Sequence, residues 1–115
     1  MKETGKYALD MCDYFHEEEK SLPQGVVDIR FPRDPSKRGI AAAHHLDRFF
    51  GDRDLEYLAL ALYQCVTARP ALDGAHQELR GHLYEMERAM KAYLREERAC
   101  DLLHAVDHAR RILQG

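Results

Sequence analysis

A chain of 115 residues that is 45% hydrophobic and 32% charged has the composition of a globular protein with one core, which excludes a disordered chain. Its net charge of −3 argues against a strongly basic nucleic-acid-binding protein. No apolar run approaches the roughly 18 residues of a membrane helix, and the start of the chain lacks the apolar core of a signal peptide. Three cysteines without a CxxC motif favour free thiols, so we expect a cytoplasmic protein that does not contact a membrane.

Apolar residues at three- and four-residue steps predict a first helix over residues 3–20. The stripe that should face the core consists of Thr4, Tyr7, Ala8, Met11, Tyr14 and Phe15. Residues 21–35 follow with three prolines, which remove backbone donors and disfavour helix in the preceding residues. We therefore expect an extended arm between the first and second helices.

Two further helices follow the arm. The second is expected over residues 36–50, with Ser36 as its N-cap and Gly51 as its C-terminal stop. The third is expected over residues 53–68, with Asp52 as its cap. Because the third helix is apolar on nearly every face, we expect it to lie at the centre of the core.

Residues 72–114 contain no proline and form either one long helix or two helices that separate at the charged run 95–98. We favour the split, because a single helix would be roughly 60 Å long at 1.5 Å per residue. The first part carries an apolar seam at nearly heptad spacing, formed by Leu79, Leu83, Met86, Met90 and Tyr93. We expect self-association through this seam; the alternative is core packing against the third helix. The fold class that results is an all-α bundle of four or five helices in one domain over residues 1–115.

The last helix carries Cys100, His104 and His108 four residues apart, on one side of the helix. This side points away from the apolar stripe, which is typical of a solvated face. The alternatives are a protein interface or a metal site shared with another helix or subunit, because one helix alone does not close a zinc shell.

Cys12 and His16 repeat the four-residue spacing on the first helix. If the first and last helices pack side by side, these residues could meet Cys100 and His104 in a Cys2His2 set. Zinc or another transition metal is the cofactor that such a set would hold.

His82 lies near the centre of the seam, with Glu78 and Glu85 about one turn to either side. We expect a histidine at the core edge that is hydrogen-bonded to a neighbour. The alternative is an imidazole oriented by a carboxylate, acting as a base or a metal ligand. The adjacent Gly81 predicts the close approach of another helix.

The stretch 30–38 gathers four basic residues around one acid. Arg30, Arg33, Lys37 and Arg38 could contact phosphate or an acidic partner; the alternative is a solvated loop. If they bind phosphate, the protein would contact nucleic acid through this arm.

The sequence holds no glycine-rich phosphate loop, GxSxG or HExxH motif, so an enzyme of a standard class is not expected. We expect a small helical interaction module or subunit of a larger assembly. The alternatives are a transition-metal-binding protein and an accessory nucleic-acid-binding subunit.

Overall fold

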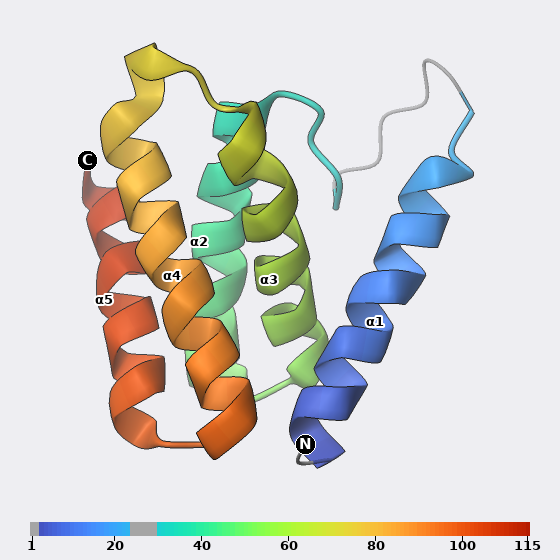
Figure 1. The fold of residues 1–115 in the computed structure, drawn as a ribbon, viewed down its shortest axis with the longest axis vertical. Coiled ribbons are helices and arrows are strands. Elements are labelled where there is room, and N and C mark those ends of the chain that lie inside the picture. The colour runs from blue at the N-terminus through green and yellow to red at the C-terminus, as the bar shows by residue number, and fades with distance from the viewer. Residues whose placement is uncertain (1–2, 24–29) are drawn as a thin grey trace.

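The computed structural model describes residues 3–23 and 30–115, and within these residues it contains five α-helices and no strand (Figure 1). The helices are α1 (Glu3–Lys20), α2 (Pro35–Asp52), α3 (Leu55–Ala68), α4 (Gln77–Glu96) and α5 (Ala99–Gln114). Two short 3-10 turns, Arg69–Ala71 and Gly74–His76, connect α3 to α4. The predicted all-helical class is confirmed, whereas part of the expected arm lies outside the described residues.

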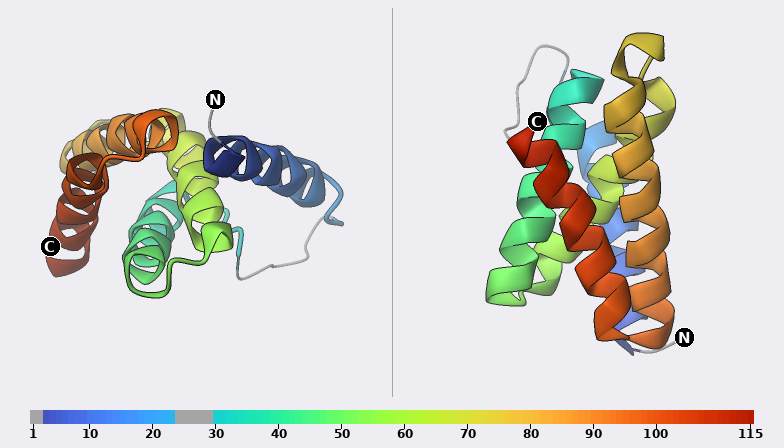
Figure 2. Two further views of the ribbon diagram at one scale, coloured as in Figure 1. Left: turned by 90° about the horizontal axis from the view of Figure 1, so that it is seen from below. Right: turned by 90° about the vertical axis from the view of Figure 1, so that its left-hand side faces the viewer.

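The helices pack around α3 in two groups, with α2, α4 and α5 in one group and α1 alone in the other. Helix α2 contacts both α3 and α5, and α4 runs along α5 (Figures 1 and 2). Helix α1 lies against α3 on the side away from α5. Among the described residues, no helix combines the length and apolarity needed to cross a bilayer.

Helix α3 is the most completely buried element, as its sequence predicts. Its side chains are buried on nearly every face, and Leu58, Leu62 and Cys65 are among them. It therefore provides the surface on which the other helices pack.

The ends of α2 and the start of α3 differ from the sequence-based expectation. Asp34, not Ser36, caps α2, because its side chain accepts a hydrogen bond from the Ser36 amide and Pro35 suits the first helical position. The helix runs past Gly51 and ends where Arg53 adopts a left-handed conformation with φ 61°. Asp54, not Asp52, then caps α3 by accepting from the Glu56 amide.

The buried face of α1 is rotated from the predicted stripe. Ala8 and Phe15 are buried as expected, but Tyr7 and Tyr14 are largely exposed. Cys12 lies on the buried side instead, where its thiol donates a weak hydrogen bond to the Ala59 carbonyl over 3.5 Å. The buried residues of α1 are Gly5, Ala8 and Phe15.

The favoured split of residues 72–114 into two helices is confirmed. Glu97 adopts φ 52°, and its amide donates to the Tyr93 carbonyl, which closes the last turn of α4. This left-handed residue reverses the chain, so that α5 returns along α4 (Figure 1). The reversal also brings polar residues at the edges of α4 and α5 into contact.

The predicted self-association seam lies inside the protein. Leu83, Met86 and Met90 are fully buried, whereas Leu79 and Tyr93 are partly buried against the same core. The first three are therefore occupied by packing within one chain, which leaves the alternative of core packing. The close helix approach occurs at Gly39 of α2, where an added Cβ would lie 2.8 Å from Leu83 Cδ1, and not at Gly81, which has open space.

Candidate metal centre

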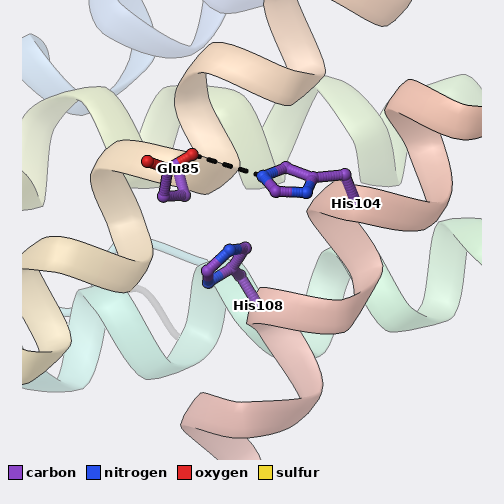
Figure 3. Close-up of side chains that lie close together, drawn as sticks. All are labelled: Glu85, His104 and His108. Atoms are coloured by element: carbon purple, nitrogen blue, oxygen red, sulfur yellow. Dashed lines mark hydrogen bonds and ion pairs between the residues drawn. The ribbon is translucent and has the colours of Figure 1, made fainter.

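Helices α4 and α5 bring together a carboxylate and two imidazoles. His104 and His108 are one turn apart on α5, and Glu85 faces them from α4 (Figure 3). His104 Nε2 donates a hydrogen bond to Glu85 Oε2 over 3.2 Å. One donor atom from each of the three residues lies within 4.8 Å of the other two. This is a convergent set of oxygen and nitrogen ligands from two helices.

A third histidine joins the cluster from α4. His82 Nδ1 lies 2.9 Å from His108 Nδ1, and the two rings are 5.2 Å apart between centroids. One of these nitrogens donates a hydrogen to the other, so at least one of the two rings accepts at Nδ1. The other nitrogen of His82, Nε2, lies 3.9 Å from Glu78 Oε1. His82 therefore fulfils the expectation of a hydrogen-bonded residue at the core edge.

The electrostatics favour the ligand forms of Glu85 and His108. The hydrogen bond from His104 lowers the pKa of the Glu85 carboxyl, which keeps it anionic. Burial lowers the pKa of His108, and the neighbouring His104 and His82 rings lower it further. A neutral imidazole beside an anionic carboxylate is the state that coordinates a metal ion.

The separations fit a transition-metal shell. With metal–nitrogen and metal–oxygen distances of about 2.0–2.2 Å, neighbouring ligands in a tetrahedral shell are roughly 3.3 Å apart. The 3.2 Å between His104 and Glu85 already meets that spacing. The donor atom of His108 lies within 4.8 Å of the other two, which is wider than this spacing. Three protein ligands leave at least one coordination position open, as in catalytic rather than structural zinc sites.

The predicted Cys2His2 set does not assemble within one chain. Cys12 and His16 are on α1, while Cys100 and His104 are on α5, and the two helices lie on different sides of the structure (Figure 1). Burial, together with the nearby Asp13, raises the pKa of the Cys12 thiol to about 11, which disfavours the thiolate that binds metal. The four residues do not meet because α1 packs against α3, which separates α1 from α5.

Cys100 is exposed at the start of α5, one turn before His104. Of the five predicted ligands, the structure brings together His104 and His108. The sequence placed Glu85 near His82 but did not predict that Glu85 would join His104 and His108. The sequence feature that could have indicated Glu85 is its spacing from His82. Three residues apart on α4, the two predict a polar edge beside the apolar stripe of that helix.

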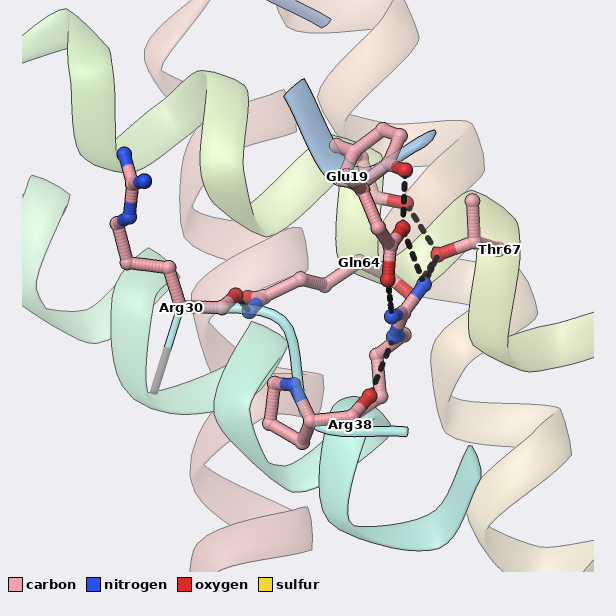
Figure 4. Close-up of polar contacts among 7 residues, drawn as sticks. Glu19, Arg30, Arg38, Gln64 and Thr67 are labelled. Atoms are coloured by element: carbon pink, nitrogen blue, oxygen red, sulfur yellow. Dashed lines mark hydrogen bonds and ion pairs between the residues drawn. The ribbon is translucent and has the colours of Figure 1, made fainter. Parts of the chain in front are cut away.

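Two of the four basic residues at 30–38 form ion pairs with carboxylates of α1. Arg30 pairs with Glu18. Arg38 pairs with Glu19 (Figure 4). Arg38 also donates to the Pro32 carbonyl at 2.8 Å and to Thr67 Oγ1 at 2.9 Å. Arg38 is thus part of the packing between α1, α2 and α3.

Arg33 and Lys37, the other two residues of the predicted basic patch, are exposed. Arg33 lines a cavity of about 360 Å³ together with Arg38 and Glu19. Since Arg30 and Arg38 already pair with carboxylates, the expected phosphate-binding patch is smaller than its sequence indicates.

No family model matches this chain, and neither the curated proteins nor the solved structures contain a match to it.

Proposed function

We propose that this protein binds a divalent transition-metal ion between α4 and α5 through Glu85, His104 and His108. The observation that carries the proposal is the convergence of their donor atoms within 4.8 Å of one another. Two imidazoles and a carboxylate suit zinc, and imidazole ligands also suit nickel and copper.

The surroundings of the cluster support this function. His82 contacts His108 Nδ1, which leaves Nε2 of His108 to coordinate the metal. Metal-bound histidines commonly hydrogen-bond through their second nitrogen, which fixes the tautomer and the orientation of the ring. His82 is thus a positioning residue, and Glu85, His104 and His108 are the ligands.

Titration calorimetry of the chelator-treated, tag-free protein with Zn²⁺, Ni²⁺ and Cu²⁺ tests the proposal. We expect one ion per chain, and at least about 100-fold weaker binding for His104→Ala with His108→Ala, since outer-shell changes alone cost 10–100-fold. The matched control is Cys12→Ser with His16→Ala, a pair at the same spacing on α1. Unchanged affinity in the first double variant, or equal loss in the control, would overturn the proposal.

A second candidate function is protein interaction, supported by an apolar surface between α1, α3 and α4. Two cavities of about 240 and 300 Å³ adjoin there, and both include Leu9 and Lys91 in their walls. Leu9 and Val66 are exposed on this surface. Sedimentation of the wild type and of Leu9→Glu tests self-association: a dimer that dissociates in the variant supports it, and a wild type that is monomeric throughout refutes it.

A further inference from the structure

An open cavity of about 490 Å³ adjoins the proposed metal site between α4 and α5. Glu85 and His104 form part of its wall, so an ion held by them has a face toward this space. The wall also contains three basic side chains, Arg88, Lys91 and Arg95. The cavity is therefore positioned to hold a ligand that reaches both the ion and these basic groups.

The charges around the cavity favour an anion. Asp101, a second acid in the wall, lies 3.0 Å from Arg98, and Lys91 lies 3.2 Å from the buried Glu87. The Arg88 guanidinium lies 4.0 Å from the Glu85 carboxylate. A bound metal ion would neutralise the charge of that carboxylate. In the described part of the chain, no ion pair or hydrogen bond engages Arg95. With a metal ion in place, the cavity carries two guanidinium groups beside a divalent cation.

We propose, on the basis of the proposed metal site, that this cavity binds the oxyanion group of a small molecule between the metal ion and the guanidinium groups of Arg88 and Arg95. One ligand oxygen occupies the open coordination position, and the others accept hydrogen bonds from the arginines. Arginine matches phosphate and carboxylate groups because its planar donors bind two oxygens at once. The cavity also lies within the roughly 300–1,000 Å³ typical of small-molecule sites.

The test uses protein loaded with Co²⁺, whose visible absorption reports changes in its own ligands. Inorganic phosphate and acetate are titrated separately, in a non-coordinating buffer, into wild type, Arg88→Gln, Arg95→Gln and the control Arg80→Gln. Arg80 is exposed on α4 and is absent from the cavity wall. The Co²⁺ affinity of each protein is measured first, so that metal loss is separated from anion loss.

We expect a saturable spectral change in the wild type and in Arg80→Gln. Removal of one exposed guanidinium should weaken the anion about five- to tenfold, since such contacts are screened by solvent. Tighter phosphate binding assigns a phosphorylated ligand, and tighter acetate binding assigns a carboxylate.

Normal Co²⁺ loading without a saturable anion response would overturn this inference and leave the metal site standing. The same holds if Arg88→Gln and Arg95→Gln bind both anions as tightly as the wild type. Failure of the wild type to bind Co²⁺ would instead overturn the proposed function itself.

Discussion

Two polar clusters join helices in this protein, and they differ in how completely their members are paired. Around Arg38, the guanidinium donates to Glu19, Thr67 and the Pro32 carbonyl. Around His108, the histidine cluster sets two ring nitrogens 2.9 Å apart, with a third ring 4.8 Å from His108 between centroids. The first cluster pairs its charges within the chain. In the second cluster, several hydrogen-bond acceptors lie close together with few N–H hydrogens to share.

The pKa shifts express the same difference. Burial raises the pKa of the Glu19 carboxyl, but hydrogen bonds from Arg38 and Tyr63 outweigh it and lower the pKa overall. Glu19 and Arg38 therefore remain a charged pair. In the other cluster, burial and neighbouring rings keep His108 neutral, which leaves its lone pair available. A completed ion pair indicates a structural contact, and a set of convergent lone pairs indicates a site for a cation.

The largest expected effect comes from breaking the first cluster. Arg38→Ala leaves Glu19 without its main partner in a partly buried position, and removing one member of such a pair costs about 3 kcal/mol. Urea denaturation measures this loss in the free energy of unfolding. The control is Arg111→Ala, which removes an exposed pair with Asp107 and should cost less than about 0.5 kcal/mol. Equal costs in the two variants would show that the Arg38 cluster is not structural.

Metal should stabilise the second cluster by a comparable amount. A ligand at 100 times its Kd stabilises the folded state by about 2.7 kcal/mol, which raises the melting temperature by roughly 10 °C in a chain of this size. Thermal denaturation with and without Zn²⁺ measures the shift. The shift should persist in Arg38→Ala and vanish in His104→Ala with His108→Ala. An equal shift in both variants would place the metal elsewhere.

A smaller effect is expected from the residue that positions His108. His82→Ala removes the hydrogen bond to His108 Nδ1 and should weaken metal binding about tenfold. His82→Gln keeps a donor at this position and should restore part of the affinity. Titration calorimetry compares the two variants, and equal affinities for both would argue against a positioning role.

The smallest effect concerns pH in the metal-free protein. The folded pKa of His108 lies below its usual value of 6.5, so the unfolded chain takes up this proton first as pH falls. Stability that is present above about pH 6.5 is therefore lost progressively until the folded pKa is reached.

Urea denaturation at about pH 7.5 and about pH 5.5 should show a loss that is smaller by roughly 0.5 kcal/mol in His108→Gln. His45, whose pKa burial also lowers, is present in both proteins and cancels in the difference. Identical pH dependence of the two proteins would contradict the shifted titration of His108.

Most helices could be predicted from the sequence, because periodicity and proline positions are local signals. The central place of α3 followed from its apolar faces, and the break near 95–98 followed from its charges. Helix ends were harder to predict from the sequence. Asp34 and Asp54 are the N-caps of α2 and α3, whereas Ser36 and Asp52 were expected. Several polar residues near each end compete for the same capping role, and backbone geometry decides between them.

The site could be predicted only in part. His104 and His108 are recognisable as a pair because their spacing is fixed within one helix. Their partner Glu85 is 19 residues from His104 along the chain, and only the left-handed turn at Glu97 brings it opposite. The predicted partners Cys12 and His16 depended on which helix α1 packs against, which sequence periodicity does not encode.

An anomalous-scattering experiment on crystals of the zinc-loaded protein tests the central claim most directly. We expect one strong peak at the zinc edge between α4 and α5, bonded to Glu85 and to the His104 and His108 rings, with His82 hydrogen-bonded to His108. A peak at Cys100 or on α1 instead, or no peak at this cluster at full zinc occupancy, would contradict it.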